Sequence, residues 1–281
     1  MNPDGVTLPT LALNDGNSIP AIGLGTFGMR GSDGVAAIAE GIRAGNRLLD
    51  TAHKYENESE VGEGLRASGV ARDELFVTTK LRGRHHGYDQ AFEGFGESLQ
   101  SLGLDYVDLY LIHWPLPKLD RFVDSWRAMI ELRDRGLVRS IGVSNFTADQ
   151  LTQLIDETGV TPAVNQIELH PHFPQVGMRA VHDRLGIVTE SWGPLATQKS
   201  LITDPVITSL ASSKDVSPTR IILRWHVQLG AVPIPKSADP QRQRENLEVF
   251  TFELSVDDMA AISALESERL WGGDPETHEE F

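Results

Sequence analysis

Apolar residues along the chain follow two alternating patterns. Short runs rich in valine, isoleucine, leucine and threonine are bounded by glycine, proline or polar residues, which is typical of β-strands. Between these runs lie longer segments whose apolar residues recur with a helical period. The pattern predicts eight strands, at Ala21–Gly25, Arg47–Thr51, Leu75–Thr79, Tyr106–Ile112, Val138–Val143, Ala163–Ile167, Gly186–Ser191 and Ala231–Pro235.

Capping residues indicate where several of the intervening helices begin and end. One helix is expected from Thr147, which can cap the first turn, to a stop at Gly159. Ser217 followed by Pro218 predicts the start of another, because proline suits the first helical position. The other predicted helices are 32–45 (beginning at Ser32 or Asp33), 58–69 and 254–266.

Three segments lie outside this alternation. Residues 6–21 predict a short β-hairpin with its turn at Asn14, Asp15 and Gly16. The segment from Ala196 to Ser217 is long enough for an extra loop or helix, and the tail after Glu268 has no period and is expected to be a loop.

Alternation of strands and helices throughout the chain is typical of a (β/α)8 TIM barrel. A doubly wound sheet alternates in the same way and stays an alternative. Residues 1–281 show no linker, change of composition or internal repeat. We therefore expect a single domain, a barrel with an N-terminal hairpin and a short C-terminal tail.

A glycine motif after the hairpin invites a different interpretation. Gly23, Gly25 and Gly28 have the G-x-G-x-x-G spacing of a dinucleotide-binding turn, and Asp50 follows at a suitable distance. Such a turn needs the helix to begin inside the motif, so that its N–H groups meet the pyrophosphate. The first capping residue here is Ser32, beyond the motif. We interpret the glycines as a tight strand-to-helix loop.

Composition narrows the classes of partner. The chain of 281 residues has 40% hydrophobic residues, no cysteine and a net charge of −15. Disulfides and cysteine zinc sites are excluded, and the charge argues against a nucleic-acid partner. The sequence has no run long enough to span a bilayer and no signal peptide, which predicts a cytoplasmic protein without a membrane partner. A phosphate-bearing ligand needs a local basic patch.

Ionisable residues follow three consecutive strands. Asp50 and Tyr55 follow the second, Lys80 the third and His113 the fourth. Because active sites of (β/α)8 barrels lie at the carboxyl ends of the strands, we expect these side chains to converge. Hydride reduction of a carbonyl needs a proton donor, and an ammonium beside a phenol makes the phenol a better acid. A carboxylate keeps the ammonium charged, and a histidine N–H can polarise the carbonyl oxygen.

Six motifs in this order resemble those of the aldo-keto reductase family. They are LDTAHKYENESEVGEGL, TTK, LYLIHWP, IGVSNF, NQIELHP and IPKSADPQRQREN. The resemblance extends from Leu8 to Thr277. The segment SWGPLA and the short tail are similar to the bacterial 2,5-diketo-D-gluconate reductase branch.

The resemblance implies an enzyme that reduces aldehydes and ketones, such as small carbonyls, α-dicarbonyls or keto-sugars, with NADPH bound without a Rossmann fold. Tyr55 is implied as the general acid, Lys80 and Asp50 as the pair that tunes it, and His113 as the residue that orients the carbonyl. Histidine at position 113, in place of glutamate, implies carbonyl reduction and not steroid double-bond reduction. The family is mostly monomeric.

Other positions carry over to the cofactor and the substrate pocket. Trp192 is implied to stack on the nicotinamide, and Lys236, Ser237 and Arg242 to form the basic patch for the 2′-phosphate. The cofactor set is completed by Ser144, Asn145, Gln166, Gly193, Leu195, Glu245 and Asn246. The pocket walls are expected to be Phe27, Trp114 and Trp271, and no metal is expected.

Two alternatives stay open. One is a metal-dependent hydrolase on the same barrel, since His170 and His172 follow the sixth strand and His85 and His86 the third. The other is a regulatory barrel protein that binds the cofactor without catalysis.

Overall fold

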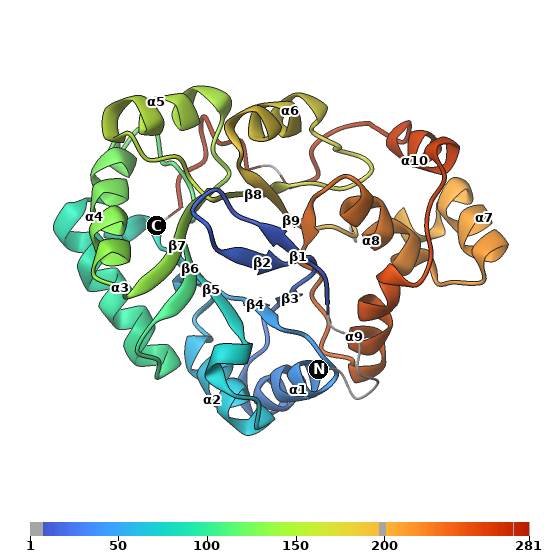
Figure 1. Ribbon diagram of the computed structural model, residues 1–281, viewed down its shortest axis with the longest axis horizontal. Coiled ribbons are helices and arrows are strands. Elements are labelled where there is room, and N and C mark those ends of the chain that lie inside the picture. Colours follow the sequence, from blue (N-terminus) through green and yellow to red (C-terminus); the bar gives the residue numbers. More distant parts are fainter. Residues whose placement is uncertain (1–7, 197–200, 272, 281) are drawn as a thin grey trace.

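Eight parallel strands form one sheet in the described part of the chain (Figure 1). The structure is a computed structural model that describes residues 8–196, 201–271 and 273–280. Each strand lies on or beside a run that the sequence predicts, and their order in the sheet follows the chain. They are β3 (Leu24–Gly25), β4 (Leu48–Asp50), β5 (Phe76–Leu81), β6 (Val107–Ile112), β7 (Val138–Ser144), β8 (Val164–Glu168), β9 (Val188–Trp192) and β10 (Val232–Pro233).

The first and last strands of the sheet meet, so the sheet closes into a barrel. Gly25 and Lys236 form a parallel bridge. The Gly23 N–H donates to the Pro233 carbonyl at 3.0 Å, and the Gly25 N–H donates to that of Pro235 at 3.1 Å. A Cβ at Gly23 would lie 2.6 Å from Ile234, so glycine permits this close approach. These contacts form a seam, and the predicted (β/α)8 barrel is confirmed.

The predicted hairpin is also confirmed, as β1 (Thr10–Ala12) paired antiparallel with β2 (Ser18–Pro20). Leu13 and Ile19 pack in one cluster with apolar residues of five barrel strands, among them Leu48, Leu109 and Val164. Figure 1 shows the hairpin lying across one end of the barrel. Because this cluster fills the interior at that end, a ligand site is left to the opposite end, where the strands reach their carboxyl termini.

Ten α-helices lie around the sheet in the described ranges. They are α1 (Gly31–Arg43), α2 (Glu58–Ser68), α3 (Tyr88–Leu102), α4 (Phe122–Asp134), α5 (Ala148–Thr158), α6 (Val176–Leu185), α7 (Pro205–Lys214), α8 (Pro218–Gln228), α9 (Pro240–Leu247) and α10 (Val256–Ser263). Short 3-10 turns include η1 (His53–Tyr55), η3 (Gly83–His85) and η5 (Leu201–Thr203).

The helix signals hold with one correction. Thr147 caps α5 through a capping box with Gln150, and Gly159 ends that helix with a φ of 69°. The expected start of α1 at Ser32 is wrong by one residue: the helix begins at Gly31, and Arg30 at its N-cap makes no side-chain cap hydrogen bond. The helix still begins after the glycine motif, as expected. The extra helix between residues 196 and 217 is α7, and residues 197–200 lie outside the described ranges.

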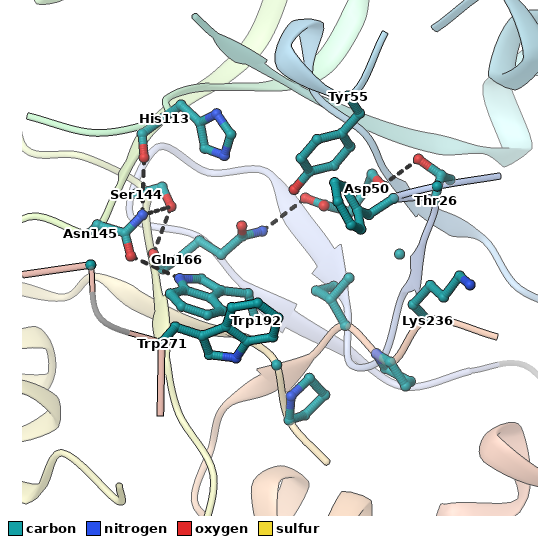
Figure 2. A pocket seen from close by; sticks show the side chains of 18 of the residues that line it. Thr26, Asp50, Tyr55, His113, Ser144, Asn145, Gln166, Trp192, Lys236 and Trp271 are labelled. Carbon is teal, nitrogen blue, oxygen red and sulfur yellow. Dashed lines mark hydrogen bonds between the residues drawn. The ribbon is translucent and has the colours of Figure 1, made fainter. Parts of the chain in front are cut away.

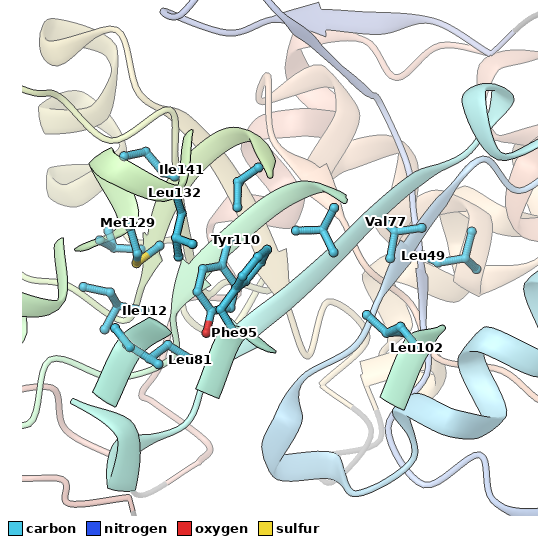
Figure 3. Close-up of a cluster of buried hydrophobic side chains, with 14 of the residues drawn as sticks. Leu49, Val77, Leu81, Phe95, Leu102, Tyr110, Ile112, Met129, Leu132 and Ile141 are labelled. Carbon is cyan, nitrogen blue, oxygen red and sulfur yellow. The ribbon is translucent and has the colours of Figure 1, made fainter. Parts of the chain in front are cut away.

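The largest hydrophobic cluster lies between the outer face of the sheet and α1 to α5 (Figure 3). On β6, Tyr110 and Ile112 belong to this outer cluster, whereas Leu109 and Leu111 belong to the barrel interior. Both faces of the strand are buried, which explains why its sequence is continuously apolar. The Phe95 and Tyr110 rings lie edge to face, 4.9 Å apart.

After α10 the chain runs without helix or strand, as expected for the tail. Figure 1 shows it crossing from α10 to the side of the barrel where α3 and α4 lie. None of the helices in the described ranges combines the length and apolar character that a bilayer crossing requires.

Candidate active site

A cavity of about 620 Å³ opens at the carboxyl ends of the strands (Figure 2). Its lining includes three of the four expected catalytic residues and all three expected pocket walls. The lining residues are Gly25, Thr26, Phe27, Gly28, Asp50, Tyr55, His113, Trp114, Ser144, Asn145, Gln166, Trp192, Gly193, Pro194, Leu195, Ala196, Ile234, Pro235, Lys236, Trp271, Gly273 and His278. Lys80 lies behind this wall, fully buried.

A buried ion pair organises the floor of the cavity. Lys80 Nζ donates to both carboxylate oxygens of Asp50, at 2.7 and 2.8 Å, and to the carbonyl of Thr51 at 2.9 Å. It also lies 3.5 Å from the Tyr55 hydroxyl. Asp50 ends β4, and η1 follows at once, so the short connection places Tyr55 beside the partner of Asp50. The expected convergence of these three residues is present.

Burial and charge act in opposite directions on this group. Burial alone would lower the pKa of Lys80, but the carboxylate of Asp50 and its hydrogen bonds raise it well above its ordinary range. Burial raises the pKa of Tyr55 above 10, and the Lys80 ammonium only partly opposes that rise. The expectation that the ammonium makes the phenol a stronger acid than usual therefore needs correction. In this cavity, the phenol keeps its proton at neutral pH.

The network extends to two further strands through Gln166 on β8. Gln166 Nε2 donates to Asp50 Oδ2 at 2.8 Å and to Glu190 Oε2, on β9, at 2.7 Å. Burial and the nearby Asp50 carboxylate raise the pKa of Glu190 to about 8, so Glu190 is protonated at neutral pH. The sequence reasoning missed Glu190. Its signal is an acidic residue inside a run that otherwise predicts a buried strand.

His113 and Phe27 flank Tyr55 on the cavity side. The His113 and Tyr55 rings are 5.8 Å apart and edge to face, and Phe27 meets Tyr55 at 5.1 Å. Figure 2 shows the His113 ring and the Tyr55 hydroxyl at the same side of the cavity. The Asn145 amide donates to the His113 carbonyl at 3.1 Å, which fixes the backbone of that residue.

Trp192 presents its indole along another wall. Its Nε1 donates to Asn145 Oδ1 at 2.8 Å, and Asn145 adopts a positive φ of 64°. Asn145 Nδ2 also donates to Ser144 Oγ at 3.0 Å, and the Ser144 hydroxyl donates to the Gln166 carbonyl. These polar groups therefore hold each other in place around the indole.

The loop after Trp192 is held from behind by His226. Its two ring nitrogens lie 3.1 Å from Ser191 Oγ and 3.1 Å from the Pro194 carbonyl. Burial lowers the pKa of His226 to about 3, so the ring is neutral. Gly193 and Leu195, expected cofactor residues, lie on this supported loop. His226 is a second residue that the sequence reasoning did not single out.

The expected basic patch continues from the cavity along the seam. Lys236 lines the cavity and is exposed, while Arg242 lies exposed in the first turn of α9. The buried side chain of Gln243 donates to the Ser237 carbonyl at 2.7 Å and to that of Ala37 at 3.0 Å. Ser237, Arg242, Glu245 and Asn246 lie outside the lining of the described cavity.

The tail covers the cavity from the side opposite the seam. His278 packs on Trp114 with ring centroids 4.1 Å apart, and Trp271 lies 6.1 Å from Trp192. Trp271 is 42% exposed and Phe27 64% exposed, so both stand free at the mouth. Glu280 Oε1 lies 3.1 Å from His113 Nδ1, a contact that no sequence pattern suggested.

The histidines of the metal-site alternative have other partners. His170 Nε2 lies 3.1 Å from Glu168 Oε1 in a buried pair. His53, His85 and Glu97 are the one group of suitable metal ligands in the described ranges. The guanidinium of Arg84 lies between them, 3.3 Å from His53 Nε2 and 3.3 Å from Glu97 Oε2. A cation of the protein itself occupies that position.

Comparison with known proteins decides the family. Residues 21–267 match the model of the Aldo/keto reductase family. The chain belongs to the aldo/keto reductase family. It is 59% identical to 2,5-diketo-D-gluconic acid reductase B of Corynebacterium sp. (strain SHS752001), over 98% of this chain and 99% of that protein. It is 47% identical to morphine 6-dehydrogenase of Pseudomonas putida, over 95% of this chain and 94% of that protein.

Solved structures agree. A Gox0644 mutant in complex with NADPH has a TM-score of 0.92 and 40% identity, covering 97% of this chain and 99% of its own. A Bombyx mori aldo-keto reductase in complex with NADP has a TM-score of 0.87 and 38% identity, covering 93% and 94%. This aldo/keto reductase is an oxidoreductase that uses NADPH and reduces carbonyl groups.

The residues present fit this cofactor. Trp192 offers an aromatic face to the cavity, Gln166 and Asn145 bring amide groups to its floor, and exposed cations lie at its seam end. A carboxamide, an aromatic ring and a phosphate therefore each find a matching group.

The buried pair yields a stability prediction. Lys80→Met should lower the free energy of unfolding by about 3–5 kcal/mol, because it leaves the Asp50 charge buried without its partner. Urea denaturation measures this, with Lys118→Met, at an exposed lysine, as the matched control. Adding Asp50→Asn to Lys80→Met should recover part of the loss. A Lys80 variant as stable as the Lys118 variant would contradict this account of the network.

Proposed function

We propose that this aldo/keto reductase reduces small polar aldehydes and ketones, including α-dicarbonyls and keto-sugars, with Tyr55 as the proton donor. The observation that carries the proposal is the Tyr55 hydroxyl at the cavity wall with the buried Lys80–Asp50 pair behind it. The name of the 59% identical relative supports a keto-sugar acid among the substrates. The apolar walls around the site support broad selectivity, since such walls discriminate by only a few kcal/mol.

Each catalytic residue has a separate task in the proposed reaction. Bound NADPH supplies the hydride that attacks the carbonyl carbon. The Tyr55 hydroxyl gives its proton to the carbonyl oxygen, and the O–H bond of the alcohol forms as the phenolic O–H bond breaks. Lys80 stabilises the resulting phenolate, and Asp50 holds Lys80 in place. His113 orients the carbonyl oxygen toward Tyr55.

The cofactor contacts are assigned by the same reasoning. We assign the nicotinamide to the face of Trp192, with Ser144, Asn145 and Gln166 near its carboxamide, and the pyrophosphate to the loop of Gly193 and Leu195. Lys236, Ser237 and Arg242 are proposed to bind the 2′-phosphate, and Glu245 and Asn246 the adenosine. In a chain of net charge −15, only such short-range contacts can favour the extra phosphate.

We also infer that the chain forms one domain and works as a monomer in the cytoplasm, with no nucleic-acid partner. The absence of cysteine suits a reducing compartment, and the acidic charge disfavours nucleic acid. Light scattering on the purified chain should give the mass of one copy, 30.9 kDa. A mass of two copies would contradict the monomer.

Tyr55→Phe tests the proton donor. Loss of a general acid should lower the rate of reduction about 10²- to 10⁴-fold for every carbonyl in a panel of keto-sugars, α-dicarbonyls and aromatic aldehydes. NADPH affinity should stay nearly constant, because the hydroxyl acts in the transition state. Absorbance of NADPH follows the rate, and Tyr88→Phe, at an exposed tyrosine, is the control. A variant that kept a tenth of the activity would exclude Tyr55 as the acid.

Arg242→Ala tests the phosphate site. A charge-assisted hydrogen bond contributes roughly 1.5–3 kcal/mol, so NADPH affinity should fall about ten- to a hundredfold while NADH affinity barely changes. Fluorescence titration with Trp192 as the reporter measures both. Arg244→Ala, at an exposed arginine of the same helix, is the matched control. Equal losses for NADPH and NADH would overturn the assignment.

A further inference from the structure

The tail brings a carboxylate to the residue that orients the carbonyl. Glu280 Oε1 lies 3.1 Å from His113 Nδ1, within ion-pair distance but off the line of a hydrogen bond. Both side chains are nearly buried, with 7% of Glu280 and 11% of His113 exposed. The Nδ1 atom is closed off from solvent, whereas the ring lines the cavity. The ring therefore presents Nδ1 to Glu280 and its other edge to the substrate space.

The tail is held at this place by contacts along its length. A Cβ at Gly83 would lie 1.6 Å from the backbone oxygen of Glu280, so the close approach of the tail requires glycine there. The Lys118 N–H donates to Glu279 Oε1 at 3.4 Å, and His278 packs on Trp114. The position of the carboxylate thus follows from a fitted seat between η3 and the segment after β6.

The charges around Glu280 keep it ionised. Burial would raise the pKa of Glu280, but the contact with His113 and the positive charges of Lys54 and Arg82 outweigh burial and lower it. His86 is the other titratable group near the pair, and burial lowers its pKa to about 4, so it is neutral. Tyr55, which faces His113 from η1, keeps its proton at neutral pH. Glu280 is therefore the anion that faces the His113 ring.

We propose that Glu280 is a positioning residue for His113: its carboxylate holds a proton on Nδ1 and so selects the imidazolium as the form that binds the carbonyl. An ionised carboxylate can only accept, so the Nδ1 that faces it carries the proton. Nε2 is then a donor only when the ring has taken a second proton. In that form, Nε2–H donates to the carbonyl oxygen with a full positive charge behind it.

This role rests on the proposed function of His113 and predicts a change in pH dependence. The imidazolium is present at low pH and is lost as the pH rises, and the Glu280 charge extends it to higher pH. Glu280→Leu removes the charge while it keeps apolar packing in a nearly buried position. The alkaline decline of kcat/KM for a ketone should then begin about one pH unit lower or more, and kcat/KM near pH 8 should fall about ten- to a hundredfold.

The experiment compares matched tail variants of the full chain with NADPH. Glu279→Leu removes a carboxylate one residue away that does not face His113, and its pH profile should match that of the parent. Glu280→Asp keeps the charge and should restore most of the profile. Gly83→Ala keeps Glu280 but displaces the tail, so it should give the Leu profile, with Gly96→Ala, which has open space around its Cβ, as control.

A readout independent of catalysis separates this proposal from the proposed function. Two-bond ¹⁵N–¹H correlation spectra, with His113→Asn to identify the ring, should show a protonated Nδ1 in the parent from about pH 6 to 9. Glu280→Leu should lower the pH at which this ring titrates. A parent that reduced no carbonyl would contradict the proposed function, yet these spectra would still test the contact. An unshifted titration or pH profile in Glu280→Leu, or an equal shift in Glu279→Leu, would overturn the proposal.

Discussion

A lysine ammonium without access to water is the constraint on which the carboxyl end of this barrel depends. Lys80 is fully buried, and its charge is stable there only because Asp50 and the Thr51 carbonyl accept its protons. Asp50 in turn receives a proton from Gln166, which also binds Glu190. One buried charge therefore fixes side chains of four strands, and the adjacent turn η1 places Tyr55 against them. The geometry of the floor follows from the need to neutralise that charge.

The sequence predicts the catalytic group because each member stands next to a strand end. Asp50, Lys80 and His113 each end or follow an apolar run, and a closed barrel brings neighbouring strand ends together whatever the loops do. The hairpin and most helix ends are predictable for a similar reason, since glycine and capping residues act within a few positions. The error at α1 is of the same local kind: Gly31 has a positive φ of 60° and begins the helix without a side-chain cap.

Residues that act over long distances could not be predicted in this way. Glu280 meets His113 through a tail with neither helix nor strand, so no period or spacing announces the contact. His226 supports the Pro194 carbonyl from a helix that packs behind the cavity, and its helical pattern is that of an ordinary buried residue. The ionisation of Tyr55 also depends on tertiary structure, because burial outweighs the neighbouring ammonium that the sequence reveals.

The seam between β3 and β10 joins two parts of the molecule that are far apart along the chain. Bringing Gly25 and Lys236 together costs the loop-closure entropy of nearly everything between them, and such non-local pairings form slowly. Lys236 belongs at once to this pairing and to the cavity wall. A ligand that binds the closed wall and not the open chain adds its binding free energy to the closed state. In this enzyme, the last step of barrel assembly and the capture of the nucleotide thus share one thermodynamic balance.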